Sequence, residues 1–237
     1  MKVDSRQLAL EWPVLPSLRA EDYVVGACNR LAHDLVLAWP DWPHFALGLS
    51  GPAQSGKTHL AHVWAESAGA GVTDAAQVAA VGPDALASRT PRWAVELGEG
   101  PWTPDQERAL FHLHNMIQAA GGALLYVARE PLARLPVTLP DLRSRLAACP
   151  AAAVSAPDEA ILRLVIAKLA ADRQIVLAEP VIEAVIRRIE RSFAAAARFV
   201  RAIDAHALAG RRPLTPRLAL EVLDALAEGE AEGADQP

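Results

Sequence analysis

The sequence predicts an α/β fold: a P-loop type parallel sheet flanked by helices, followed by a small all-α domain. Three observations support this prediction. Short apolar runs of strand length alternate with segments of helical periodicity, which is typical of a parallel sheet covered by helices. A glycine-rich loop lies between one apolar run and a helical segment. After about residue 155 the strand-like runs stop and only helical segments follow, and the length of 237 residues suits one mid-sized domain with a small second one.

The glycine-rich loop is the most informative element. From Gly51 to Thr58 it has the pattern G-x-x-x-x-G-K-[ST], in which backbone N–H groups surround the phosphates of a nucleotide. Lys57 places an ammonium group on the β- and γ-phosphates, and the Thr58 hydroxyl can ligate Mg²⁺. Residues 45–49 before the loop form an apolar run, and helical spacing begins at Thr58, so a helix N-terminus lies behind the phosphates. The sequence therefore predicts binding of ADP or ATP with Mg²⁺.

The other elements of the α/β part follow in order. A helical segment opens it, with Leu31, Leu35 and Ala38 on one face, and prolines close that segment. Residues 69–92 are weakly patterned, and no element is predicted there. Nucleotide is expected at the carboxyl ends of the strands. The predicted elements are a helix within 21–42, strands at 45–49, 93–97 and 123–127, and helices around 110–117 and 142–146.

Four helices are predicted in the second part. Prolines and acidic residues mark helix starts and glycines mark helix ends, with the fourth helix ending at Gly229. The acidic segment after it lacks apolar anchors and is expected to be disordered. The predicted division is a flexible arm at 1–18, a nucleotide-binding domain at 19–154, a helical lid at 155–228 and a disordered tail at 229–237.

Charge, cysteine content and the pattern of apolar residues exclude several classes of protein. A formal charge of −5 provides no overall basic field, so direct sequence-specific DNA binding is not expected. The two cysteines, Cys28 and Cys149, lie far apart, which indicates a reducing compartment and excludes a disulfide scaffold. Neither a secretory leader nor a membrane-length apolar run is present, so the expected location is cytoplasmic, without membrane attachment.

The N-terminal residues form a separate candidate site. Gln7, Leu8, Leu10 and Trp12 precede prolines that keep the backbone extended. Such a peptide can dock into a groove on another protein, or it can fold back on its own domain. The residue types alone leave both alternatives open.

Four segments resemble a known family. The order of a nucleotide-binding domain followed by a helical lid is similar to the AAA+ class. The four segments resemble, in order, the opening segment, the P-loop, the arginine-finger box and the second sensor of the bacterial replication initiator DnaA. The chain stops after the lid, without DnaA's helix-turn-helix domain, and is in this respect similar to the Hda family of DnaA regulators. The segments are EDYVVGACNRLAHDLV (21–36), GPAQSGKTHL (51–60), LPDLRSRL (139–146) and AARFVRAID (196–204).

The resemblance implies a function and partners. An Hda-like protein is tethered to the DNA-loaded sliding clamp of DNA polymerase III, promotes ATP hydrolysis by DnaA and prevents re-initiation. Gln7, Leu8, Leu10 and Trp12 would then contact the clamp, although Glu11 departs from the usual peptide pattern. A self-acting AAA+ ATPase such as a helicase loader remains the alternative, a P-loop nucleotide kinase is a poorer match, and self-association is left open.

The resemblance also implies residue roles. Arg145 would be an arginine finger that acts in trans on a neighbour's γ-phosphate, and Arg198 would contact the chain's own nucleotide from the lid. Glu96 would hold Mg²⁺ through water, as a degenerate Walker B carboxylate where the family usually has Asp. The expected nucleotide contacts are Val24, Val25, Gly51, Gln54, Ser55, Gly56, Lys57, Thr58, His59 and Arg198.

Two departures from the AAA+ pattern predict weak hydrolysis. Leu97 stands where AAA+ enzymes have a second acid that orients the attacking water, and Val127 with Ala128 replaces the polar first sensor. The binding residues are intact. The expected protein is thus a degenerate P-loop ATPase, acting mainly as an activator of DnaA in trans.

Overall fold

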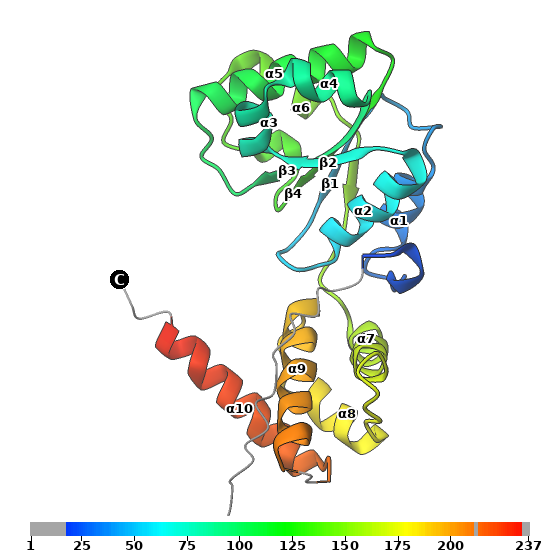
Figure 1. Cartoon of the computed structure of the whole chain (residues 1–237), viewed down its shortest axis with the longest axis vertical. Coiled ribbons are helices and arrows are strands. Elements are labelled where there is room, and N and C mark those ends of the chain that lie inside the picture. The colour runs from blue at the N-terminus through cyan, green and yellow to red at the C-terminus, as the bar shows by residue number, and fades with distance from the viewer. Residues whose placement is uncertain (1–17, 211–212, 234–237) are drawn as a thin grey trace, which may run out of the picture.

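A five-stranded, all-parallel sheet forms the first domain. The computed structural model describes residues 18–210 and 213–233, so the N-terminal candidates Gln7, Leu8, Leu10 and Trp12 lie outside the described residues. The strand order is β2-β3-β4-β1-β5, which confirms the predicted fold class. Figure 1 shows the sheet with helices packed around it and the four lid helices below. The strands are β1 (Ala46–Ser50), β2 (Gly71–Asp74), β3 (Arg92–Gly98), β4 (Ala123–Ala128) and β5 (Ala151–Ala153).

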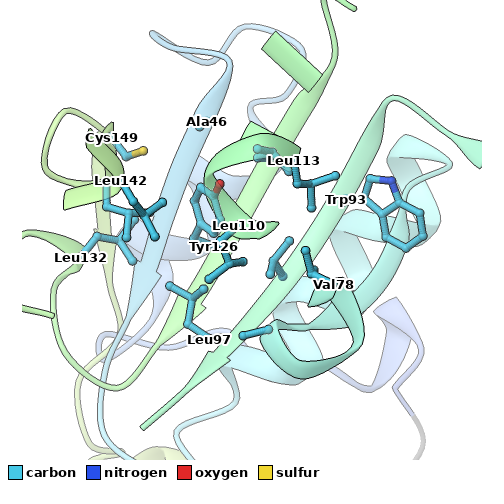
Figure 2. Packing of buried hydrophobic residues seen from close by; sticks show 14 of the residues in the cluster. Ala46, Val78, Trp93, Leu97, Leu110, Leu113, Tyr126, Leu132, Leu142 and Cys149 are labelled. Carbon is cyan, nitrogen blue, oxygen red and sulfur yellow. The ribbon is translucent and has the colours of Figure 1, made fainter. Parts of the chain in front are cut away.

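Helices cover both faces of the sheet. Successive residues of β4 alternate between two cores, because side chains of a strand point to opposite faces. Leu124 and Tyr126 pack with α5 in one core, where Figure 2 shows Tyr126 beside Leu110. Leu125 and Val127 pack with α1 and α2 in the other core. The helices of this domain are α1 (Arg30–Leu37), α2 (Lys57–Ala68), α3 (Ala75–Val81), α4 (Pro83–Arg89), α5 (Pro104–Ala119) and α6 (Pro140–Ala147), with 3₁₀ turns η1 (Ala20–Asp22) and η2 (Leu132–Arg134).

The first helix differs from its prediction. The sequence places Leu31 on the core face, but Leu31 is 83% exposed. The buried residues of α1 are Ala32 and Val36, one helical turn apart. Leu35 and Leu37 of the same helix are partly buried against this core, so the buried stripe lies to one side of Leu31.

Two strands and two helices were not predicted. β2 is an edge strand whose residues are only partly buried, so it lacks the apolar run that marks β1 and β4. β5 consists of three alanines, which carry no strand preference. Helices α3 and α4 occupy the weakly patterned segment, each with 7 residues.

The lid has its own hydrophobic core. Phe199, Val185, Leu162 and Ile203 are fully buried within it. Helix α10 continues to Gly233, past the predicted end at Gly229, because one glycine costs a helix only about 1 kcal/mol among good helix formers. No helix among the described residues is long and apolar enough to cross a membrane. The lid helices are α7 (Glu159–Ala171), α8 (Glu179–Ile186), α9 (Phe193–Gly210) and α10 (Pro216–Gly233).

A buried carboxylate fixes the start of α6. Glu107 of α5 is 1% exposed. Its Oε1 accepts a hydrogen bond from the Thr138 amide at 2.8 Å, and its Oε2 accepts from the Thr138 hydroxyl and the Leu139 amide, both at 2.7 Å. Leu139 is the N-cap residue of α6, so Glu107 satisfies a backbone donor at the helix start.

Glu107→Ala is expected to destabilise the protein by about 2–3 kcal/mol, because it leaves buried donors unsatisfied. Burial alone would raise the pKa of Glu107, but the bonds from Thr138 and Leu139 outweigh it and lower the pKa below 4.5. A carboxyl with a lowered folded-state pKa contributes stability that is present above 4.5 and lost as pH falls through the folded value. Urea unfolding from neutral to acidic pH measures this loss, and the Ala variant should lack it. The exposed Glu66→Ala serves as control, and an equal pH dependence in wild type and Glu107→Ala would contradict the assignment.

Candidate functional site

The P-loop connects β1 to α2 at the carboxyl edge of the sheet. Gly56 is the N-cap of α2 and has φ +89°, in the left-handed region that favours glycine. Gly51 has φ +154°, and a Cβ there would lie 2.3 Å from the Val154 carbonyl oxygen. Both glycines are therefore required by the backbone path of the loop.

Lys57 points into this loop. Its Nζ donates to the Pro52 carbonyl oxygen at 2.5 Å and lies 3.4 Å from the Ser55 hydroxyl. Burial lowers the pKa of Lys57, and the Glu96 carboxylate partly offsets this while Arg129 adds to it. A desolvated ammonium held only by neutral oxygens is suited to an anionic ligand such as a phosphate.

Glu96 lies two residues before the end of β3, close to Lys57 and Thr58 of the loop. Its Oε1 is buried and has no hydrogen-bond partner among the described residues. Burial raises the pKa of Glu96, whereas the Thr58 hydroxyl, Lys57 and His62 lower it. The described residues contain no group of three or more His, Cys, Asp or Glu that could hold a metal by itself. An unsatisfied carboxylate oxygen beside the Thr58 hydroxyl fits Mg²⁺ held largely by phosphates and water.

The nearby positions that could take part in ATP hydrolysis hold apolar side chains or an acid engaged in an ion pair. Leu97 is 3% exposed and belongs to the core on the α5 face (Figure 2). Val127 and Ala128 are buried too. Glu99 forms an ion pair with Arg129, whose carbonyl oxygen accepts a hydrogen bond from the Gly51 amide at 3.2 Å. Among the described acids near the end of β3, Glu96 is thus the one with a buried carboxylate oxygen that has no hydrogen-bond partner.

The segment before α1 joins the loop to the lid. Asn29 is 1% exposed, its Oδ1 accepts from the Gly26 amide at 2.8 Å, and its Nδ2 donates to the Val24 carbonyl at 2.9 Å. These bonds fix the backbone around the predicted contacts Val24 and Val25. Val24 packs on the lid core, and a Cβ on Gly26 would lie 1.9 Å from the Ile161 side chain of α7. Sequence reasoning missed Asn29, although it stands at the N-cap position before α1.

Two aromatic rings flank the loop. A Cβ on Gly56 would lie 3.6 Å from the Tyr23 ring and 3.7 Å from the Phe193 ring. Phe193 begins α9, so the lid reaches the loop through this residue. The Tyr23 ring also meets His59 edge-on, with centroids 5.2 Å apart, and burial raises the Tyr23 pKa to about 12. Tyr23 and Phe193 are site residues that the sequence analysis missed, since isolated aromatics carry no motif.

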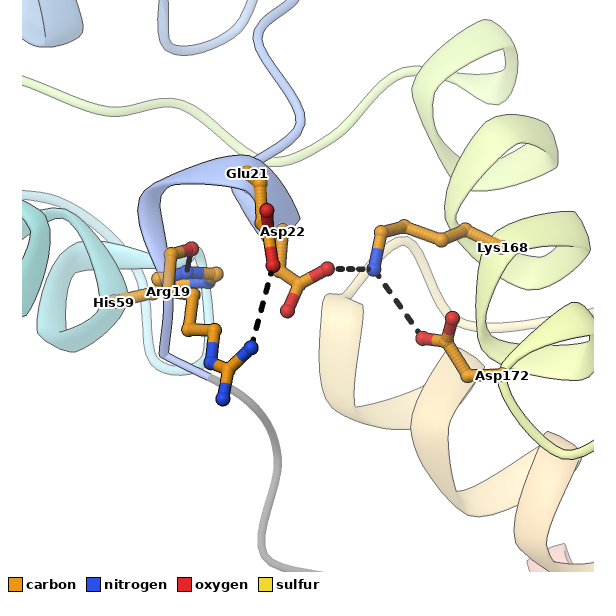
Figure 3. Close-up of polar contacts among 6 residues, drawn as sticks. All are labelled: Arg19, Glu21, Asp22, His59, Lys168 and Asp172. Atoms are coloured by element: carbon orange, nitrogen blue, oxygen red, sulfur yellow. Dashed lines mark hydrogen bonds and ion pairs between the residues drawn. The ribbon is translucent and has the colours of Figure 1, made fainter.

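Polar contacts link the same region to the lid (Figure 3). His59 Nε2 lies 2.8 Å from the Arg19 carbonyl oxygen, which ties α2 to η1. Asp22 of η1 pairs with Lys168 of α7 at 2.5 Å, and Lys168 also contacts Asp172 at 3.2 Å. His59 therefore supports the segment beside the nucleotide-binding loop, and Lys168 connects the sheet domain to the lid.

Lys168→Met should loosen the lid. Burial would lower the pKa of Lys168, but hydrogen bonds and charges from Asp22 and Asp172 raise it above 10.5. Its contribution to stability is therefore present below pH 10.5 and lost as pH rises through the folded value. We expect a loss of about 1 kcal/mol, because the pair is partly exposed, and faster hydrogen exchange at η1 and the start of α9. Unchanged exchange there would show that the apolar contacts alone hold the lid.

Arg198 lies inside the lid. Its Nη2 is 3.6 Å from the Glu190 carboxylate, and it lines a hollow of about 250 Å³ with Arg188 and Asp224. Phe193, the residue of α9 that reaches the loop, precedes Arg198 by five positions, roughly 7.5 Å along a helix. The assignment of Arg198 to the nucleotide stays a prediction.

Arg145 lies on α6 and contacts α5. Its Nη1 donates to Gln118 Oε1 at 3.0 Å, and its guanidinium carbon is 5.9 Å from the centroid of the Phe111 ring. No hydrogen bond or ion pair among the described residues joins Arg145 to its own P-loop residues. Arg143, two positions earlier, is exposed.

The fold and the site define a P-loop AAA+ module: a β2-β3-β4-β1-β5 sheet, a phosphate-binding loop at its carboxyl edge and a helical lid against that loop. Comparisons with solved structures support a DnaA-like form of this fold. Domain III of the Thermotoga maritima replication initiation protein DnaA superposes with a TM-score of 0.75 at 16% identity, covering 90% of this chain and 98% of that one.

Two further structures are similar. AMPPCP-bound DnaA from Aquifex aeolicus has a TM-score of 0.68 at 16% identity, covering 92% of this chain and 71% of that one. The Thermotoga maritima RuvB Holliday junction branch migration motor has a TM-score of 0.62 at 17% identity, covering 83% of this chain and 66% of that one. No protein-family model and no curated protein matches the chain. At these identities the comparisons establish the fold.

Proposed function

We propose that the chain is an Hda-like regulator of replication initiation that binds ADP or ATP, is tethered to the sliding clamp and promotes ATP hydrolysis by DnaA. The observation that carries the proposal is the combination at the end of β3. The loop with Lys57 is complete, whereas a core leucine, Leu97, follows Glu96 where a hydrolytic acid is needed. A site of this kind holds nucleotide better than it cleaves it.

Each residue has a role in this proposal. Lys57 would leave the Pro52 carbonyl and bind phosphate oxygens, while Thr58 directly and Glu96 through water would hold Mg²⁺. The metal would neutralise phosphate charge when bound. Because Leu97 cannot orient water, the bound nucleotide stays intact and fixes the lid through Phe193. Arg145 then supplies a guanidinium to the γ-phosphate on a neighbouring DnaA.

The test is the rate of ATP hydrolysis by ATP-loaded DnaA with this chain and DNA-loaded clamp present. We expect stimulation that depends on both the clamp and residues 1–12, since the proposed clamp contacts are Gln7, Leu8, Leu10 and Trp12. Deleting residues 1–12 should abolish stimulation without changing thermal stability. A chain that stimulates equally well without the clamp would contradict the tethering, and a chain that never stimulates would contradict the proposal.

A self-acting ATPase remains the second candidate, because Glu96 is present and its buried oxygen fits Mg²⁺. Steady hydrolysis by the isolated chain distinguishes it. Turnover that Glu96→Gln removes would favour the second candidate, whereas retained, uncleaved nucleotide would favour the regulator.

A further inference from the structure

The side chain of Arg145 is held by two residues of the neighbouring helix. Gln118 accepts a hydrogen bond from Arg145 Nη1 at 3.0 Å. Phe111, seven positions earlier on α5, places its ring 5.9 Å from the guanidinium carbon. Seven residues are two helical turns, so both contacts come from one face of α5. A charge-assisted hydrogen bond and a cation–π contact fix the guanidinium in two directions.

The backbone that carries Arg145 is fixed by the same helix. Glu107 holds the start of α6 through Thr138 and Leu139, and Gln118 meets Arg145 near the end of α6. Glu107 and Gln118 are eleven residues apart, roughly 16 Å along α5. The start of α5 contacts the start of α6, and the end of α5 contacts the end of α6. Helix α5 therefore supports both helix α6 and the side chain of Arg145.

A buried histidine, His114, lies on α5 between Phe111 and Gln118. His114 is 1% exposed, its Nδ1 is 3.1 Å from the Tyr126 hydroxyl, and its ring meets Phe45 edge-on at 4.9 Å. Burial, followed by the charges of Arg145 and His44, lowers the pKa of His114 to about 4. The imidazole is thus neutral at physiological pH and does not repel the guanidinium.

We propose that Gln118 and Phe111 are positioning residues for Arg145, holding its guanidinium ready to act on the nucleotide of a neighbouring subunit. This rests on the proposed function of Arg145 as a finger in trans. A long arginine side chain on a short helix samples many rotamers unless its head is bound. Residues that do not touch the reacting atoms can still favour the reactive geometry, because they fix the position of the charged group in advance.

The experiment uses the full chain with Gln118→Met and Phe111→Leu, alone and together. Methionine keeps the length of glutamine and removes the acceptor oxygen, and leucine removes the aromatic face. Phe111→Tyr retains that face and should behave as wild type. Gln77→Met, at an exposed glutamine of α3, is the matched control.

Two spectroscopic readouts report on Arg145 without DnaA. The Nε–Hε NMR signal of Arg145, assigned by its absence in Arg145→Ala, should have the relaxation of an ordered group in wild type. In the double variant it should become mobile. The pKa of His114 should rise above about 4 as the guanidinium moves away, while burial, the largest cause of the lowered pKa, still holds it below 6.5. Both substitutions are neutral, so no other charge changes. An ordered Arg145 signal in the double variant would overturn the proposal.

Stimulated hydrolysis by DnaA supplies the functional readout. The double variant should lose stimulation on the order of tenfold, less than Arg145→Ala, because the group is misplaced and not removed. A mobile Arg145 with full stimulation would show that positioning is irrelevant and would overturn the proposal. Full stimulation by Arg145→Ala would instead reject the finger itself, and the relaxation data would still show whether α5 holds the side chain.

Discussion

Under the proposed function, Arg145→Ala is expected to lower the stimulation of DnaA ATP hydrolysis by about 10³-fold, while nucleotide binding by the chain itself is unchanged. Arginine fingers contribute roughly 10³ to 10⁵ in rate by stabilising charge on the transferring phosphoryl group. Arg145 contacts Gln118 and Phe111 and no P-loop residue among those described. Its removal should therefore leave the chain's own site intact. The measurement is single-turnover hydrolysis of DnaA-bound ATP with clamp and DNA.

Arg143→Ala is the matched control for this prediction. Arg143 is exposed on the same short helix, so its loss removes one positive charge from that helix without touching Arg145. A general electrostatic effect on assembly would weaken both variants similarly and would decrease with salt. A specific finger would appear as a loss in Arg145→Ala only. Equal losses would assign the effect to surface charge and contradict the finger.

The elements that sequence predicted are those whose pattern depends on local physics. β1 and β4 are continuous apolar runs because both of their faces are covered, and the P-loop glycines are dictated by positive φ and by contact with Val154. β2 could not be predicted, because an edge strand with half-covered residues needs no apolar run. For α1 the sequence identified a helix but not its buried face, since Leu31 is exposed while Ala32 is buried.

The candidate site likewise contains residues that a local motif predicts and residues that only the fold brings together. The motif predicted Lys57 and Thr58, since phosphate and metal chemistry demand those residue types at that spacing. Tyr23, Phe193 and Ile161 reach the site from segments far apart in the chain, and only the packing of the lid brings them there. Their side chains are ordinary core types. Sequence patterns contain no information on such contacts without the fold.

Lys57→Met is expected to weaken ADP and ATP binding by at least about 10²-fold without destabilising the ligand-free protein. The ammonium of Lys57 is desolvated, and its contacts are the Pro52 carbonyl and the Ser55 hydroxyl. Folding gains little from this arrangement, because burial of the charge offsets the two hydrogen bonds. With phosphates bound, the same charge forms ion pairs in a dry site and contributes strongly to affinity.

Thermal unfolding with and without ADP separates the two effects. A ligand at 100 times its dissociation constant stabilises a protein by about 2.7 kcal/mol, and a 10²-fold weaker variant loses most of that shift. The ligand-free melting temperature of Lys57→Met should equal or exceed that of wild type. Lys2→Met, a lysine distant in sequence from the loop, is the control and should retain the full ADP shift. An undiminished ADP shift in Lys57→Met would show that the loop is not the nucleotide site, since no other described residue combines a buried ammonium with a glycine-rich loop at a helix start.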